Sequence, residues 1–190
     1  MPRKPEYDRG DLIERARDLF WQHGWAGTSL KDLEGALKLN PGSIYAAFGS
    51  KDALFELAMD QYATDGADRI KDLESTLGPL GTLKEFPRVV IGSDDAPAKA
   101  CMLAKTVLEL RGRDHRLATV ANRHLEMMEG RFVELFQRAQ SAGEIDQTHD
   151  AKTLARRYQS DLMGLRISAE RDGVDAEAIA GEFAESLDRL

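Results

Sequence analysis

The stretch 28–55, TSLKDLEGALKLNPGSIYAAFGSKDALF, constrains the fold of this chain more than any other part of it. A helix is expected after Ser29, an N-cap residue type, because leucines then recur every three or four positions. A second, short helix is expected after Asn40, whose side chain can cap it, with Pro41 at the first helical position. Ser50 can cap a third helix. Two helices joined by a tight turn form a helix-turn-helix, whose second helix can lie in the major groove of DNA.

A series of residues in and before this stretch follows the order and spacing of a known family. It consists of Ala16, Leu19-Phe20, Gly24, Thr28-Ser29, Leu33, Gly42-Ser43-Ile44-Tyr45, Phe48, Ser50-Lys51 and Leu54. The series resembles the N-terminal signature of TetR-family transcriptional regulators. One position departs from it, because the family usually has Gly in the turn where this chain has Lys38. A positive φ at Lys38 would carry strain that Gly avoids.

The expected DNA contacts gather on the short helix and its two neighbours. The resemblance implies that Thr28 contacts the DNA backbone. Gly42 and Ala46 are small enough to let the short helix approach base edges. Tyr45 can reach a phosphate through its hydroxyl, and Lys51 combines a cation with a helix N-terminus. The full expected set is Arg3, Lys4, Thr28, Lys38, Asn40, Pro41, Gly42, Ser43, Tyr45, Ala46 and Lys51. Two readings of the first nine residues, which include Arg3 and Lys4, stay open: a frayed terminus or an arm that touches DNA.

The charge distribution is compatible with DNA binding although the net charge is −7. Residues 1–51 hold eight Lys or Arg against seven Asp or Glu, a balance of +1, which leaves −8 for the remainder. Exposed charges are screened beyond about 8–10 Å, so the local balance matters for phosphate attraction. With 42% hydrophobic and 31% charged residues and no long apolar run, we expect a globular cytoplasmic protein without a membrane partner. The single Cys101 excludes an intramolecular disulfide.

The remaining chain shows helical periodicity and no strand alternation, so an all-α fold is predicted. Residues 1–50 are expected to form a three-helix DNA-binding head, and 51–190 a helical regulatory and dimerisation domain. Gly78-Pro79-Leu80-Gly81 is expected to end the connecting helix and to mark the joint to the rest of the domain. The expected helices are 10–23 and two short ones in the head, then 51–76, 83–90, 97–111, 117–140, 150–172 and 175–190.

The last two expected helices have an apolar face broader than one packing partner needs, which favours burial against a second subunit. The resemblance implies that two such helices pair with their copies in a four-helix bundle. Two-fold symmetry then predicts a palindromic operator. The expected interface residues are Leu154, Tyr158, Leu162, Leu165, Ala169, Ile179, Phe183 and Leu187.

No enzyme motif is present, and the four histidines are scattered along the chain. We therefore expect neither an enzyme nor a cofactor or metal. The resemblance implies instead a small-molecule effector bound in the C-terminal domain. Cys101 could be a small buried hydrophobe, a reactive thiol or a ligand for a soft metal, and these alternatives stay open. The candidate pocket residues are Cys101, Met102, Lys105, His124, Met127, Met128 and Tyr158.

The sequence thus predicts a sequence-specific DNA-binding regulator, a homodimeric repressor that its effector releases from a palindromic operator. The alternative from another class is a helical ligand-binding or interaction protein whose regulator-like head has no DNA function. A regulator without any effector is a third reading. Salt dependence of specific DNA binding separates the first two.

Overall fold

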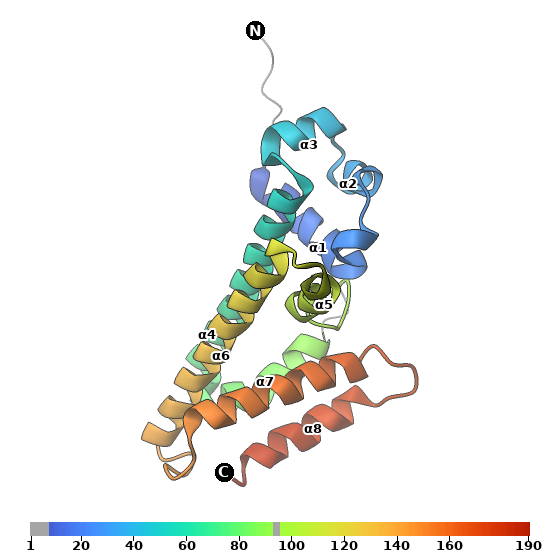
Figure 1. Ribbon diagram of the computed structural model, residues 1–190. Helices are drawn as coiled ribbons and strands as arrows, with labels where there is room; N and C mark the ends of the chain where they lie inside the picture. Colours follow the sequence, from blue (N-terminus) through green and yellow to red (C-terminus); the bar gives the residue numbers. More distant parts are fainter. Residues whose placement is uncertain (1–7, 93–95) are drawn as a thin grey trace.

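The structure is a computed structural model that describes residues 8–92 and 96–190. In these two ranges the chain forms eight α-helices and one short 3₁₀ turn, with no strand, so the all-α prediction is confirmed (Figure 1). The elements are α1 (Arg9–Gly27), α2 (Leu30–Leu37), α3 (Pro41–Phe48), α4 (Lys51–Gly92), α5 (Met102–Leu110), η1 (Arg111–Arg113), α6 (Arg116–Ser141), α7 (Ala151–Ser168) and α8 (Ala176–Leu187).

Helices α2, α3 and α4 begin where the capping residues of the sequence predict. Ser29 caps α2 by accepting from the Asp32 N–H, and the Asp32 carboxylate accepts in return from Ser29 N. Asn40 caps α3 through a 2.9 Å bond from Ser43 N. Ser50 caps α4 through a 3.0 Å bond from Ala53 N. Each cap satisfies an N–H group that the first turn of a helix leaves free.

In the turn between α2 and α3, Lys38 adopts the left-handed conformation in which a non-glycine residue is strained. Lys38 has φ 54° and ψ 39°, the conformation in which Gly usually ends a helix. A Cβ in this region meets the following carbonyl oxygen, which costs roughly 1–2 kcal/mol. The helix-turn-helix geometry is therefore kept at this turn in spite of a local strain.

Helix α4 runs the length of the molecule beside α6 and joins the head at one end to α7 and α8 at the other (Figure 1). The predicted break lies at Gly78, which has φ 70° and ψ −179°. The helix is interrupted at this residue, and the chain changes direction there as the sequence predicted. Thr82 Oγ1 donates to the Gly78 carbonyl at 2.7 Å, and helix resumes up to Gly92. The expected helices 51–76 and 83–90 are thus two arms of one kinked element.

Two hydrophobic clusters fill the molecule. The first joins the inner faces of α1, α2 and α3 to α4, α5 and the start of α6, and its centre includes Phe20, Phe55 and Leu103. The second joins the far arm of α4 to α6, α7 and α8 around Phe132 and Tyr158. The first cluster extends across residue 50, so the head is packed onto the rest of the chain rather than suspended from it.

Helix α1 is interrupted at Gly24, with φ 77° and ψ 177°, and α5 supplies the bonds that this interruption removes. Lys105 Nζ donates to the carbonyls of Trp21 at 2.7 Å and of Gln22 at 3.2 Å, which lie just before the break. Lys105 was expected in a ligand pocket. The structure corrects this, because its ammonium group caps the first part of α1.

Glu109, one turn further along α5, satisfies the other side of the interruption. Its carboxylate accepts from Trp25 N at 3.1 Å and from Ala26 N at 2.7 Å. A Cβ at Gly24 would lie 2.8 Å from Glu109 Oε2, so both the positive φ and the close approach require Gly at this position. We call Lys105 and Glu109, with the four backbone groups they hold, the α1–α5 clamp.

We expect Lys38→Gly to raise the free energy of unfolding by roughly 0.5–1 kcal/mol, because relief of the left-handed strain exceeds the added entropy of Gly in the unfolded chain. The matched control is Lys71→Gly, at an exposed position inside α4. The same change there should lower the free energy of unfolding by about 0.5–1 kcal/mol. Chemical denaturation measures both, and equal signs for the two variants would contradict the assigned strain.

Candidate nucleic-acid interface and the cavity beside it

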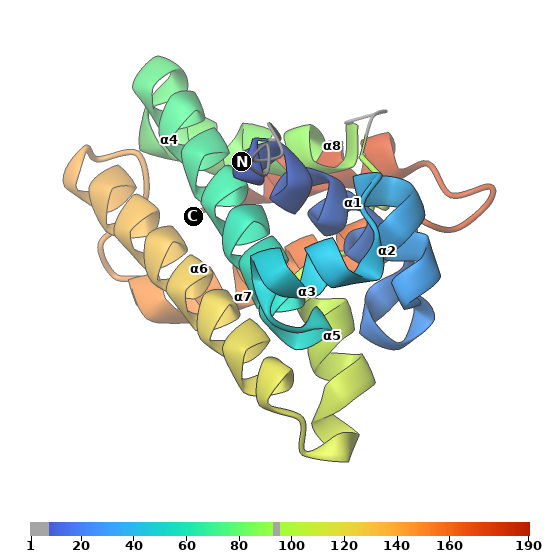
Figure 2. The same ribbon diagram turned by 90° about the horizontal axis from the view of Figure 1, so that it is seen from above.

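The outer face of α3 is small, polar and uncovered. Ile44 and Phe48 turn inward, with 1% and 6% of their surface exposed. Figure 2, seen from above, shows α3 lying across the end of the molecule in front of the helices behind it. On this outer face Lys38, Asn40, Gly42, Tyr45 and Ala46 are exposed, and Pro41 and Ser43 are half-buried. The structure thus brings seven of the expected DNA contacts together.

Two larger side chains flank the small residues of this face. Tyr45 is 47% exposed, so its hydroxyl is free to reach outward. Lys51 lies with its ammonium 4.5 Å from the centre of the Trp25 ring. Burial against this ring lowers the pKa of Lys51 from its ordinary value, which Asp52 partly opposes. Trp25 is itself fixed by a 2.8 Å bond to Asp52, so the cation has a defined place beside the start of α4.

Thr28 does not lie where a DNA contact requires it. Only 1% of its surface is exposed, and its hydroxyl donates to the Gly24 carbonyl at 2.7 Å. The side chain secures the end of α1 instead of facing outward, which corrects the expected phosphate contact. Its neighbours Ser29 and Lys31 are exposed on the same turn. Arg3 and Lys4 lie outside the described residues.

Arg9 is a cation of this surface that the sequence did not reveal. Its guanidinium donates to the Ala47 carbonyl at 2.7 Å and lies 4.8 Å from the centre of the Phe48 ring. The residue is exposed beside the end of α3, although 38 positions separate it from Ala47. No local pattern signals this proximity, because it depends on how α1 packs against α3.

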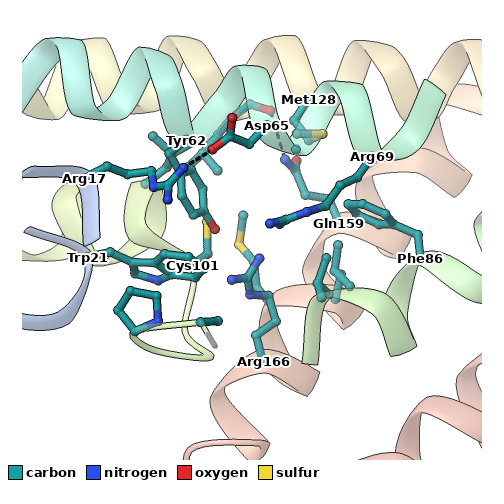
Figure 3. A pocket seen from close by; sticks show the side chains of 18 of the residues that line it. Arg17, Trp21, Tyr62, Asp65, Arg69, Phe86, Cys101, Met128, Gln159 and Arg166 are labelled. Carbon is teal, nitrogen blue, oxygen red and sulfur yellow. Dashed lines mark hydrogen bonds and ion pairs between the residues drawn. The ribbon is translucent and has the colours of Figure 1, made fainter. Parts of the chain in front are cut away.

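A cavity of about 300 Å³ lies between the head and the body of the molecule (Figure 3). Its walls come from α1, both arms of α4, the segment before α5, and helices α6 and α7. Aromatic and aliphatic groups alternate with five charged side chains. The lining residues are Arg17, Asp18, Trp21, Tyr62, Asp65, Gly66, Arg69, Phe86, Val90, Ala96, Pro97, Cys101, Leu103, Leu125, Met128, Phe132, Gln159, Leu162, Met163 and Arg166.

The head itself forms one wall of this cavity through α1. Arg17 is bonded to Asp65 of α4 and to Asp18, the latter at 2.7 Å (Figure 3). Burial alone would lower the pKa of Arg17, but these two carboxylates outweigh it and raise the pKa. Trp21 donates its indole N–H to the Ala100 carbonyl at 2.7 Å. The cavity therefore borders both the DNA-binding head and the segment that leads into α5.

Only two of the seven predicted pocket residues, Cys101 and Met128, line this cavity. Cys101 is a half-buried free thiol beside Tyr62, whose pKa burial raises. Met102 is 1% exposed and belongs to the hydrophobic core, so it is corrected to a packing residue. Within the described ranges no group of three or more His, Cys, Asp or Glu is placed to hold a metal ion.

The other candidates lie elsewhere. His124 and Met127 border a separate hollow between α4 and α6, where His124 Nε2 lies 2.9 Å from Asp60. Tyr158 is 2% exposed and donates its hydroxyl to the Leu83 carbonyl at 2.8 Å. It therefore belongs to the core between α4 and α7. The cavity residues that the sequence did not reveal are Arg17, Trp21, Tyr62, Arg69 and Arg166.

Comparison with known proteins matches residues 12–58 to the family described as bacterial regulatory proteins, tetR family. The HTH-type transcriptional repressor ComR of Escherichia coli (strain K12) is 30% identical over 179 residues, 91% of this chain and 84% of that protein. The chain belongs to the TetR family of transcriptional regulators. An uncharacterized regulator of this type, YezE of Bacillus subtilis (strain 168), is 29% identical over 90% of each chain.

A solved structure supports the same assignment over the whole chain. The TetR-family regulator CifR, a cysteine mutant complexed with a 26 bp double-strand operator DNA, superposes with a TM-score of 0.82 at 28% identity. The match covers 99% of this chain and 98% of CifR. This TetR-family protein is therefore a DNA-binding regulator and not an enzyme, as predicted. In the part of the chain that the structure describes, no helix is long and apolar enough to span a membrane.

The expected pairing residues divide into two sets by burial within the chain. Tyr158, Leu162, Leu165 and Leu187 are largely buried in the core of their own subunit, although Leu165 also borders a groove at the surface. Leu154, Ala169 and Phe183 are half-buried, and Ile179 is 37% exposed. A shallow groove between α7 and α8 remains open, bordered by Ser160, Asp161, Gly164, Leu165, Ser168, Ile179, Glu182, Phe183 and Ser186.

We expect Thr28→Val to lower the free energy of unfolding by about 1–2 kcal/mol, because the Gly24 carbonyl loses its buried donor. Thr28→Ser keeps the hydroxyl and should retain most of the stability. At temperatures well below their unfolding midpoints, both variants should bind operator DNA with the affinity of the parent. Unchanged stability with weakened DNA binding in Thr28→Val would restore Thr28 as a DNA contact.

Proposed function

We propose that this protein is a homodimeric repressor that binds a palindromic operator and leaves it when a small molecule occupies the cavity between head and body. The observation that carries the proposal is the position of α1. This helix packs against α2 and α4 of the head region, reaches the end of α3 through Arg9, and also forms a wall of the cavity. A DNA-binding protein of this kind acts in the cytoplasm, where its operator lies.

The surface of α3 and the cations around it support contact with DNA. Small residues at Gly42 and Ala46 allow close approach to base edges, while Tyr45 and Lys51 border them. Arg9 adds a cation beside the end of α3. Side chains such as these, together with the α4 N-terminus, hold phosphates and thereby set the register of the reading helix.

The support for repression and release comes from relatives and from geometry. ComR is named a repressor, and CifR binds an operator. A ligand shifts an equilibrium only when its affinity differs between the two arrangements. The cavity has α1 on one side and α7 on another, so a movement of the head changes the walls around a bound molecule. Release then follows when the ligand-bound arrangement no longer matches the spacing of the two half-sites.

The first experiment selects bound sequences from a random DNA library and titrates the selected site against salt. A palindromic site with steep salt dependence supports the proposal. No enrichment at low salt, from a protein shown to be a folded, ligand-free dimer, would contradict it. That result would favour a helical ligand-binding protein with a head that does not bind DNA.

We expect Tyr45→Ala and Lys51→Ala each to weaken operator binding about 10-fold while leaving the dimer intact. Lys51→Ala should also reduce the slope of log affinity against log salt by about 1 for each head, because one phosphate contact is lost. Lys71→Ala, an exposed cation on α4 away from α3, is the matched control and should change neither value. Full DNA affinity in both head variants would refute the assigned interface.

We expect Ile179→Glu to separate the dimer and thereby to remove operator binding, because it places a carboxylate at the α7–α8 groove beside Glu182. Sedimentation or light scattering measures the subunit mass. Leu108→Glu is the matched control, since Leu108 is the most exposed large hydrophobic residue at 83% and lies on α5. The control should remain dimeric, and a dimeric Ile179→Glu variant would exclude this face as the interface.

A further inference from the structure

The cavity between head and body holds a buried cation that forms no ion pair with any residue the structure describes. Arg166 is 8% exposed, and its Nε donates to the Lys99 carbonyl at 2.6 Å. Among residues 8–92 and 96–190, no carboxylate lies within ion-pair distance of its guanidinium. A buried charge without a counter-charge is unfavourable, because the surroundings replace only part of the lost hydration.

A second cation, the solvent-exposed Arg69, borders the same cavity. Figure 3 shows Arg69 of α4 and Arg166 of α7 both directing their guanidinium groups into the cavity, toward one another. Arg69 also forms no ion pair with any described residue. The two carboxylates that line the cavity, Asp18 and Asp65, are already bonded to Arg17. Among the described residues, the cavity therefore has one buried cation, Arg166, and one solvent-exposed cation, Arg69, that form no ion pair, in a protein whose net charge is −7.

The rest of the lining fits an apolar group rather than a fully hydrated ion. Trp21, Phe86 and Phe132 supply aromatic surface, and Val90 and Leu162 supply aliphatic surface. The volume of about 300 Å³ lies at the lower end of the range for small-molecule sites. An occupant of matching chemistry has one anionic end and a compact apolar body.

We propose that the effector of this regulator is a small organic carboxylate, whose carboxylate group Arg166 and Arg69 bind and whose apolar body lies against the aromatic wall. The planar fork of a guanidinium matches a carboxylate in two-point contact. This inference rests on the proposed function, since it names the chemical class of the ligand that occupies the same cavity. It adds Arg166 as the residue that selects the class.

The same groups connect the carboxylate to the head. The cavity places Arg17 of α1 beside the proposed site, where its guanidinium is bonded to Asp65 of α4. An added carboxylate competes with Asp65 for this guanidinium. Arg166 also holds the Lys99 carbonyl, next to Ala100, whose carbonyl accepts from Trp21 of α1. Binding at Arg166 thus acts on two of the ties that position α1.

The experiment measures calorimetric binding of acids and their neutral amides to the ligand-free full-length protein. The probes are phenylacetate, benzoate, hexanoate and octanoate, each paired with its amide, together with inorganic phosphate. At least one acid should bind 10-fold or more tightly than its amide, and phosphate should bind more weakly than that acid. If no acid exceeds its amide, or if phosphate binds best, the proposal is wrong.

Variants at one position test the role of Arg166. Arg166→Gln should weaken the preferred acid at least 10-fold without affecting its amide, and Arg166→Lys should recover part of the loss. Arg156→Gln, an exposed arginine of α7 that pairs with Glu129, is the matched control and should bind like the parent. Equal acid affinity in Arg166→Gln and the parent would overturn the assignment.

A purely structural role for Arg166 is separated by thermal unfolding without ligand. Arg166→Gln removes a buried charge and also the bond to the Lys99 carbonyl, and these changes have opposite effects on the unfolding midpoint. A purely structural role would lower the midpoint and the affinities for acid and amide alike, whereas a ligand-binding role lowers the affinity for the acid alone. Operator release is scored separately. An acid that binds through Arg166 without releasing DNA refutes ligand release but supports the carboxylate as the ligand class. Release of DNA by neutral compounds alone supports ligand release but refutes the carboxylate as the ligand class.

Discussion

The position of the DNA-binding head depends on the α1–α5 clamp. Gly24 interrupts α1, and the interruption leaves carbonyls on one side and N–H groups on the other without helical partners. Lys105 and Glu109, one turn apart on α5, satisfy both sides. Two of the four bonds, those to Trp21 and Trp25, are partly buried, and backbone groups shielded from water are costly to leave without partners, so these bonds favour contact between α1 and α5. The first hydrophobic cluster then covers the junction.

Since α5 fixes only the end of α1, the middle of α1 is where the body of the molecule can influence the head. Arg17 and Trp21 lie there, and both face the cavity. Their partners, Asp65 and the Ala100 carbonyl, belong to α4 and to the segment before α5. A change in the cavity therefore reaches α1 through two polar contacts, while the clamp keeps the end of the helix in place. Hydrogen bonds and ion pairs that have two discrete arrangements can carry coupling of this kind.

The sequence predicted those features that neighbouring residues determine. Asn40 caps α3 as predicted, because a cap depends on a few adjacent positions. The positive φ of Lys38 was raised as a condition only by the family's usual Gly at this turn. Helical periodicity also located most helices, since it requires only an apolar stripe. It did not reveal which element covers that stripe. Tyr158 and Leu165 were therefore assigned to a second subunit although α4, α6 and α8 of the same chain bury them. The predicted roles of Thr28 and Lys105 were wrong for the same reason. Thr28 donates to the Gly24 carbonyl and Lys105 to the carbonyls of Trp21 and Gln22, and the sequence does not show these contacts.

Arg166 was the hardest residue to assign from sequence, because arginine on a helix is usually a solvated surface group. Its meaning comes from burial against Trp21, the Lys99 carbonyl and the facing Arg69. An empty site that already contains an unneutralised cation is less stable than a neutral cavity of the same shape. An anionic ligand removes that penalty at the moment of binding, so part of its affinity reflects relief of a strained ligand-free state. An anionic ligand shifts the head only when one arrangement encloses Arg166 more fully than the other, because a ligand needs different affinities for the two arrangements.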